Sequence, residues 1–305
     1  MNLNRKSKAA GISILSNTSL ILLKLVAGIV TGSVSLIAEA IHSMMDLLAA
    51  VVAFISVRVS DNPPDAKHPF GHGKAENISG VIEGVLIFIA AGLIINEAVH
   101  KIVEGTSLEM LEIGMIIMAV SIIVNIVVSR YLVKVSRDTD SLALEADATH
   151  LTTDVITMVG VLIGLVVVRV TGLYILDPII AIIVAIIIIK AAFDITRKSF
   201  GDLMDTSLPE PEQKAITLCV QEHIGKVSGF HKLRTRKAGS QRYLDLHLVI
   251  PRMESLEQAH DICDHLENDI NGILERAEVN IHVEPCDTDC EKCPTSCDVV
   301  NSISN

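Results

Sequence analysis

The sequence predicts a bundle of six transmembrane α-helices followed by a small cytoplasmic α+β domain, on two observations. The first is composition, because the 305 residues are 50% hydrophobic with a mean hydropathy of +0.49. The second is a change of pattern after about residue 200. Spanning a bilayer takes roughly 20 mostly apolar residues. Six segments meet this length, at about Ile12–Thr31, Val34–Val59, Ile78–Val103, Leu108–Val133, Leu142–Val170 and Ile175–Ile195.

Basic residues indicate how the six segments are oriented. Arg5 and Lys8 precede the first segment as in a signal peptide, but no small-residue cleavage site follows, so we expect a mature helix. Lysine and arginine gather at the ends that share a side with the N-terminus, whereas the opposite ends offer only Lys101 and Arg169. Positive residues favour the cytoplasm. We therefore expect a multi-pass protein of the cell (inner or plasma) membrane with both termini cytoplasmic.

The segment after Pro209 reads as a second domain. Its pattern is helix, strand, strand, helix, strand, and its elements are expected at Glu210–Ile224, Phe230–Lys237, Tyr243–Ile250, Leu256–Leu274 and Val279–Glu284. We expect domains at 1–205 and 206–285, then a cysteine-rich tail at 286–305. Such a short α+β module lies near the lower limit for independent stability, which favours dimerisation.

Charge is shared unevenly along the chain. The formal net charge is −11, and from Asp205 onward 18 Asp and Glu face 10 Lys and Arg. An acidic cytoplasmic domain argues against nucleic acid, which prefers basic surfaces. It suits a domain that attracts cations, although acidic surfaces also occur on domains that bind nothing.

Two apolar segments carry the same polar pair. His42 and Asp46 lie in the second segment, and His150 and Asp154 in the fifth. Residues four apart share one face of a helix. Ionisable groups are costly in lipid and mark functional sites there. Two nitrogens and two carboxylates from facing helices make a tetrahedral cage for a divalent transition metal.

The depths of the four residues in the membrane support a shared site. At 1.5 Å per residue, His42 and His150 each lie roughly 12 Å from the end at which their helix enters, and Asp46 and Asp154 roughly 18 Å. Because the two helices run antiparallel, all four groups can meet near the middle of the membrane. The alternative is that each side chain separately satisfies a buried hydrogen bond between helices.

Two further groups have ligand chemistry outside the lipid. Asp65, His68 and His72 have close ligand spacing in the loop after the second segment, where Gly71 and Gly73 let the backbone fold around an ion. The second group falls on the predicted strands and second helix of the C-terminal domain: His231, His247, His260, His282 and Glu284. The alternative for both is ordinary solvated polar side chains.

Four cysteines close the chain with the spacing C-x3-C-x2-C-x3-C: Cys286, Cys290, Cys293 and Cys297. Clustered thiolates can hold zinc or another soft metal, and stable disulfides are rare in the cytosol. The segment has few apolar residues with which to fold. A metal-capturing or redox-sensitive tail and an inert one both remain open.

These motifs resemble the cation diffusion facilitator family. The resemblance lies in six spans, His68-Pro-Phe-Gly-His-Gly-Lys-Ala-Glu76, the Ala146-Asp-Ala-x-His150-x-x-x-Asp154 stretch and a metallochaperone-like cytoplasmic domain. It extends to the bacterial ferrous-iron and zinc efflux proteins. It implies a homodimer that exports divalent metal in exchange for protons, with His42, Asp46, His150 and Asp154 as the transport site. It also implies that the loop and domain groups bind metal and that the domain ligands can bridge two protomers.

The chain departs from many bacterial relatives, which have Asp at the position of His42. Two nitrogens and two oxygens favour Zn²⁺ as the transported ion, with Fe(II), Co and Cd as alternatives. We also expect zinc bound to the cytoplasmic domain, as a regulatory or structural ion. A membrane metal sensor is the other functional class. A passive channel is disfavoured because a tight four-ligand cage would bind the ion too strongly for fast conduction, and an enzyme would need an open metal position.

Overall fold

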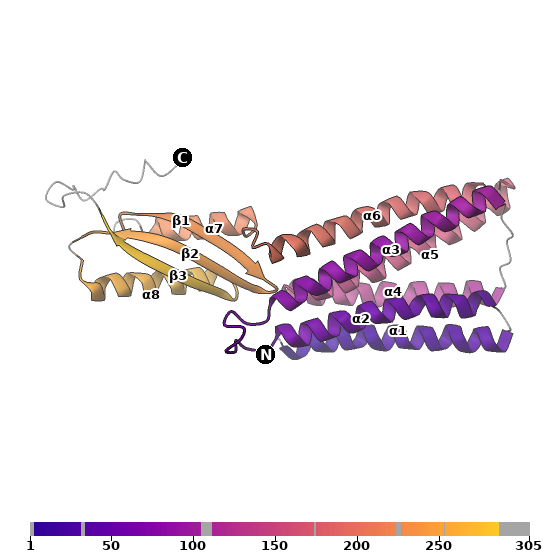
Figure 1. Ribbon diagram of the computed structural model, residues 1–305, viewed down its shortest axis with the longest axis horizontal. Helices are drawn as coiled ribbons and strands as arrows, with labels where there is room; N and C mark the ends of the chain where they lie inside the picture. The colour runs from indigo at the N-terminus through magenta and orange to yellow at the C-terminus, as the bar shows by residue number, and fades with distance from the viewer. Residues whose placement is uncertain are drawn as a thin grey trace. The chain divides into compact units, whose positions relative to one another are not determined.

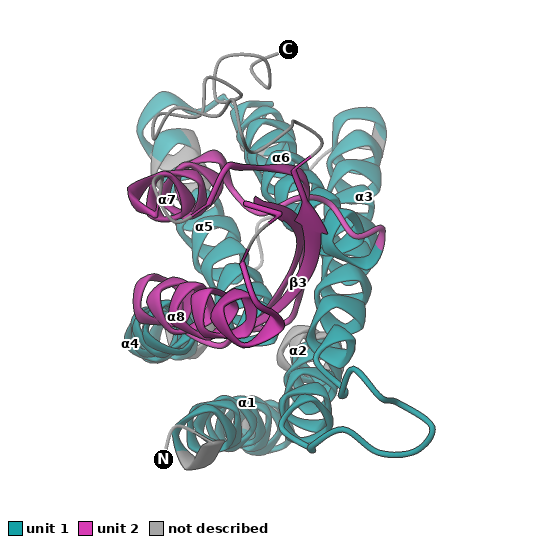
Figure 2. Cartoon of the chain, turned by 90° about the vertical axis from the view of Figure 1, so that its left-hand side faces the viewer, with its two compact units in different colours: residues 1–203 teal, residues 204–305 magenta. Residues whose placement is uncertain are grey.

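The computed structural model describes residues 3–31, 34–104, 112–173, 175–223, 227–252 and 254–286. Side chains are described for these residues except 3–4, 31, 34–39, 41–42, 104, 112–114, 164–166, 168–169 and 177. The chain divides into two compact units, Met1–Leu203 and Met204–Asn305, which are coloured separately in Figure 2. Each unit is described by itself.

Unit 1 contains six long helices among its described residues (Figure 1). They are α1 (Leu3–Thr31), α2 (Val34–Ser60), α3 (Lys74–Glu104), α4 (Glu112–Thr139), α5 (Leu142–Thr171) and α6 (Leu176–Leu203). The helices that were expected to begin at Ile78 and to end at Ile195 extend further, to Lys74 and Leu203 respectively. Their apolar spans continue into polar residues with good helix propensity, which hydropathy alone does not include.

Membrane-spanning character is strong in these helices. Among the described residues, five helices hold stretches long and apolar enough to cross a bilayer: Arg5–Val30, Ser43–Ser60, Lys74–Val103, Met115–Thr139 and Pro178–Leu203. The remaining helix, α5, has 30 residues, but its first half carries Glu145, Asp147 and Asp154. It contacts α2, α3, α4 and α6, so protein surrounds its polar face. A central helix can carry such residues because it need not face lipid.

Glycines allow α3 and α6 to approach closely. A Cβ atom at Gly80 would lie 2.2 Å from Ser199 Oγ, and one at Gly84 would lie 2.0 Å from Thr196 Oγ1. Both separations are shorter than any contact between real atoms of these kinds. The two glycines stand four residues apart and therefore line one face of α3, the small-residue pattern typical of membrane helix pairs.

A buried ion pair joins four helices near the beginning of α3. Lys6 Nζ lies 2.8 Å from Glu76 Oε1, and both side chains are almost completely buried. The same carboxylate accepts hydrogen bonds from Ser60 Oγ (2.9 Å) and Ser141 Oγ (2.6 Å). Since every one of these groups is paired, this network satisfies the condition under which buried charge is tolerated.

Unit 2 folds in the predicted order of elements. These are α7 (Glu210–Glu222), β1 (Gly229–Ala238), β2 (Gln241–Ile250), α8 (Leu256–Ile273) and β3 (Ala277–Pro285). The sheet order is β1-β2-β3, with β1 antiparallel and β3 parallel to β2. A capping box at Ser255 and Gln258 begins α8.

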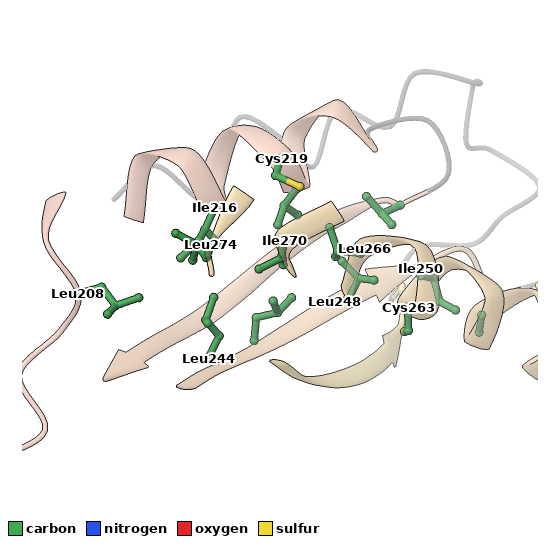
Figure 3. Packing of buried hydrophobic residues seen from close by; sticks show 14 residues of the cluster. Leu208, Ile216, Cys219, Leu244, Leu248, Ile250, Cys263, Leu266, Ile270 and Leu274 are labelled. Atoms are coloured by element: carbon green, nitrogen blue, oxygen red, sulfur yellow. The ribbon is translucent and has the colours of Figure 1, made fainter. Parts of the chain in front are cut away.

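Both helices of unit 2 cover the same face of the sheet (Figure 2). Alternate residues of β2, from Leu244 to Ile250, point into this core, where they pack against α7 and α8 (Figure 3). Leu248 and Leu266 are completely buried there. The strand period of two places the intervening residues of β2 on the opposite face, which no helix of the described unit covers.

Candidate metal centres

The first candidate site lies inside unit 1, between α2 and α5. His150 Nε2 lies 3.3 Å from Asp46 Oδ1 and 4.0 Å from Asp154 Oδ2. The His150 side chain is 5% exposed, and the two carboxylates are partly exposed. Ligand atoms of Asp46, His150 and Asp154 all lie within 4.8 Å of one another, close enough to hold one metal ion.

This arrangement follows from two local rules. His150 and Asp154 are four residues apart on α5, so they share one face. α2 and α5 contact each other, and the predicted levels bring Asp46 opposite His150. The side chain of His42, the fourth predicted ligand, lies outside the described residues. Its backbone belongs to α2, one turn before Asp46.

A cavity of about 250 Å³ adjoins this site. Asp46, His150 and Asp154 lie in its wall. The wall also includes residues nearer the C-terminal ends of α1 and α3, such as Lys24 and Ile94. Lys24 Nζ donates a hydrogen bond to Ser43 Oγ at 2.7 Å, and both side chains are nearly buried. The cavity wall therefore contains polar groups, Lys24 and Ser43, as well as the carboxylates of Asp46 and Asp154.

The second candidate site is the loop between α2 and α3. Asp65 Oδ1 lies 3.2 Å from His68 Nδ1, and Asp65 Oδ2 lies 3.4 Å from His72 Nε2. The backbone N–H groups of His68 and Lys67 donate to Asp65 Oδ1, and the first of these bonds is the main reason why the pKa of Asp65 is lowered. Gly71 takes a φ of +77°, which closes the loop.

The third candidate site lies on the sheet face of unit 2 that faces away from the helices. His231 pairs with His247 across β1 and β2, and His247 pairs with His282 across β2 and β3. Directly paired residues point to the same side of a sheet. Glu284, two residues after His282, shares this side.

Hydrogen bonding draws these side chains together. Glu284 Oε1 lies 2.7 Å from His247 Nδ1, and Glu284 Oε2 lies 3.2 Å from His231 Nε2. The His247 hydrogen bond is the main cause that lowers the pKa of Glu284, and His231 adds electrostatic attraction. His282 Nε2 stands further away, at 3.7 Å from Glu284 Oε1.

The structure does not bring His260 into this group. It lies on α8, is largely exposed, and has its Nδ1 3.6 Å from Asp264 Oδ1 of the same helix. Within one chain, α8 covers the other face of the sheet, so four of the five predicted residues share the uncovered face. Ligand atoms of three of them, His231, His247 and Glu284, lie within 4.8 Å of one another. Of the four tail cysteines, Cys286 is buried at the end of β3. Cys290, Cys293 and Cys297 lie outside the described residues.

Comparisons with known proteins agree with this architecture. Residues 10–204 match the family model of the cation efflux transmembrane domain, and residues 208–286 match that of the cation efflux protein cytoplasmic domain. The chain belongs to the cation efflux family. Its members, the cation diffusion facilitators, are transporters rather than enzymes, and this cation efflux protein is accordingly a multi-pass membrane protein.

Relatives match this cation efflux protein over most of their length. An uncharacterised transporter of Synechocystis is 36% identical over 86% of this chain and 85% of its own. The cation-efflux pump FieF of Shewanella oneidensis is 31% identical over 91% of this chain and 93% of its own. A solved structure of CzrB in its zinc form is 38% identical, covering 27% of this chain and 92% of its own, with a TM-score of 0.26.

Sequence reasoning missed several polar groups near the first site. Asn17 Nδ2 donates to the backbone oxygen of Asp46 at 3.4 Å, and Lys24 lies in the cavity wall. Glu83 of α3 and Asp147 of α5 are completely buried. All four are polar residues within apolar segments, and that is the signal by which the sequence could have singled them out.

Proposed function

We propose that this cation efflux protein exports a divalent transition metal, zinc foremost, from the cytoplasm through His42, Asp46, His150 and Asp154. The observation that carries the proposal is the approach of the ligand atoms of Asp46, His150 and Asp154 within 4.8 Å, between two long helices of mostly apolar sequence. Three such groups at one point in a membrane have a large desolvation cost unless they bind cations. His42, one helical turn from Asp46, would complete the set of ligands.

Zinc is the favoured cargo because of the ligand chemistry. Two imidazoles and two carboxylates in a tetrahedron suit an ion that has no geometric preference of its own. Fe(II), Co and Cd are the alternative substrates, since affinity alone separates such ions poorly.

Proton exchange would follow from the same ligands. Imidazole and carboxylate bind metal only when deprotonated, so metal and protons compete for the same lone pairs. A site that loads metal on one side and takes up protons on the other couples the two fluxes. Relative movement of helices about a fixed site would provide alternating access.

Orientation and assembly complete the proposal. The distribution of lysine and arginine favours an orientation in the inner or plasma membrane with both termini in the cytoplasm. Residues 208–286 match the cytoplasmic domain of cation efflux proteins. We propose that this domain joins two copies of the chain into a homodimer. His260 would then complete the zinc site around His247 and Glu284 of the partner, which explains its separation from them within one chain.

A transport assay in proteoliposomes tests these proposals together. We expect uptake of Zn²⁺ that accelerates when a pH gradient supplies protons to the opposite side. Co²⁺, Fe²⁺ and Cd²⁺ in parallel would rank the substrates. Uptake that ignores the pH gradient would contradict antiport, and metal binding without uptake would favour the membrane sensor instead.

A further inference from the structure

A second group of carboxylates in unit 1 is more completely buried than the carboxylates of the proposed transport site. Glu83 of α3 and Asp147 of α5 are both 0% exposed. Each acts electrostatically on His150, and Asp147 acts on Glu83, so the three groups are neighbours. Glu83 stands one helical turn from Ile87, and Asp147 nearly one turn from His150, and both of these residues line the cavity.

These carboxylates lack the hydrogen bonds that burial requires. Among the described residues, Glu83 Oε2 and both oxygens of Asp147 have no hydrogen-bond partner. Only Glu83 Oε1 is satisfied, by Ser79 Oγ at 3.0 Å. The fully paired carboxylate of Glu76, on the same helix, shows the contrast. Two bare anions in a dry interior are strongly unfavourable, so each carboxylate must bind either a proton or a metal cation.

The Ser13 hydroxyl is a second buried polar group next to this pair of carboxylates. The Ser13 hydroxyl of α1 faces the Asp147 carboxylate, and the Ser13 side chain is 0% exposed. Its Oγ has no hydrogen-bond partner in the described part of the chain, and neither has Nδ1 of His150. Buried oxygens without hydrogen-bond partners among the described residues therefore come from α1, α3 and α5 in one region of unit 1.

We propose that Glu83 and Asp147, with Ser13, form an inner cation site that a divalent metal ion occupies on its way to the transport site. Carboxylate and hydroxyl oxygens with remaining waters suit a hard or borderline divalent ion held loosely. The pair lies between the transport site and the helix ends that carry the N-terminus, opposite to the cavity. An ion that enters from those ends meets Glu83 and Asp147 before it meets Asp46.

The inner site rests on the proposed export function and adds a step to it. In the present conformation the transport site adjoins a cavity on one side, and the inner site is closed on the other. When the helices rearrange to open the opposite side, the two carboxylates become the first anions that a cytoplasmic cation encounters. Their charge raises the local metal concentration next to the cage.

A binding experiment on the full chain in lipid nanodiscs tests the site directly. Asp46→Asn and Asp154→Asn remove the transport site, and His72→Ala and Glu284→Ala remove the loop and sheet sites. Serine in place of Cys286, Cys290, Cys293 and Cys297 removes the candidate ligands of the tail. We expect this variant to retain one bound Co²⁺ with the weak absorbance of an oxygen-ligated ion, and to lose it on adding Glu83→Gln and Asp147→Asn. No bound Co²⁺, or binding that survives these two substitutions, would overturn the inner site.

A transport experiment separates the inner site from simple buried acids. With the transport site intact, we expect Glu83→Gln and Asp147→Asn each to raise the KM for Zn²⁺ on the loading side about tenfold, with the maximal rate within about twofold. Glu83→Asp should recover part of the loss. Glu97→Gln, an exposed carboxylate on the same helix, is the matched control.

A failure of the proposed function and a failure of the inner site give different results. If the wild-type protein moves no metal, the proposed function itself is wrong. If the wild type transports normally and both variants keep its KM, then Glu83 and Asp147 are only protonated structural groups and the inner site is wrong. A lower rate at unchanged KM would also overturn it, because such a residue would act after loading.

Discussion

His150 Nε2 lies 3.3 Å from Asp46 Oδ1, although 104 positions separate the two residues in the chain. His150 and Asp154 share α5 and keep their spacing whenever that helix moves. Asp46 belongs to α2, so its distance to His150 depends on how α2 and α5 are placed. A small relative shift of these helices would therefore change the ligand geometry, which links metal affinity to helix arrangement.

We predict that His150→Ala and Asp154→Ala each abolish metal transport while dimerisation persists. Each substitution removes a proposed ligand, and none of the other described residues in that group can replace it. Loss of one ligand weakens metal affinity strongly, since even the loss of a residue that only supports a ligand costs about 10–100-fold. Metal uptake into proteoliposomes checks the first result, and size-exclusion chromatography with light scattering checks the second.

The matched control for these variants is His265→Ala, an exposed histidine outside the three candidate sites. It should transport like the wild type. Wild-type uptake by both His150→Ala and Asp154→Ala would remove the transport site from this position, whatever the behaviour of the control.

Much of this fold could be predicted from periodicity. The six apolar segments and the order of elements after Pro209 are local properties, since each depends on residues within one helix or strand. The meeting of Asp46 with His150 also followed from depth, because antiparallel helices of known rise fix the levels of their residues. The approach of His231, His247 and Glu284 depends on strand register, and only the shared face of His282 and Glu284 could be anticipated.

The remainder could not be predicted, for physical reasons that particular residues illustrate. Glu83 and Glu97 are both glutamates of α3, yet one is completely buried and the other is exposed. Which face of α3 meets α5 and α6 depends on packing, which a single hydropathy pattern does not contain. His260 likewise falls on a helix whose side of the sheet is set by the crossover between β2 and β3.

Ligand type should control metal selectivity. We predict that His42→Asp broadens the substrate range toward harder ions such as Mn²⁺, because it replaces a nitrogen ligand by oxygen. Competition of Mn²⁺ with Zn²⁺ uptake is the measurement, with His223→Ala of unit 2 as a control. An unchanged metal profile in His42→Asp would count against the ligand argument.

Close packing of α3 on α6 predicts a stability effect. Gly84→Val should lower the melting temperature of the protein in detergent, since its Cβ would overlap Thr196 Oγ1 and overpacking costs about 1–3 kcal/mol. Gly92→Val on the same helix is the matched control, because a Cβ there meets no atom within 4 Å. Equal melting temperatures for the two variants would contradict this account of the helix pair.

The cysteine tail can be tested by a single multiple variant. If Cys286, Cys290, Cys293 and Cys297 capture metal, then replacing all four with serine should reduce the number of soft metal ions bound per chain, because hydroxyls are poor ligands for soft ions. Equilibrium dialysis with Cd²⁺ gives that number. A variant that binds as many ions as the wild type would assign the tail no metal-capturing role.

Acid should weaken the sheet site of unit 2 in two separate stages. Metal and protons compete for the imidazole nitrogens of this site, so Zn²⁺ affinity should fall as the pH drops from about 7.5 to about 5.5. Glu284 stays ionised throughout this range, because the hydrogen bond of His247 lowers its pKa in the folded state. A lowered pKa gives stability that is present above the unfolded value of about 4.3 and is lost as the pH falls through the folded value.

We therefore predict that Glu284→Gln weakens Zn²⁺ binding at every pH without changing the slope of affinity against pH, whereas His247→Ala makes that slope shallower. Calorimetric titration of Zn²⁺ between pH 5.5 and pH 7.5, about one unit on either side of free imidazole, measures both. A shallower pH dependence in Glu284→Gln than in the wild type would show that the carboxylate, and not the histidines, is the group that takes up protons.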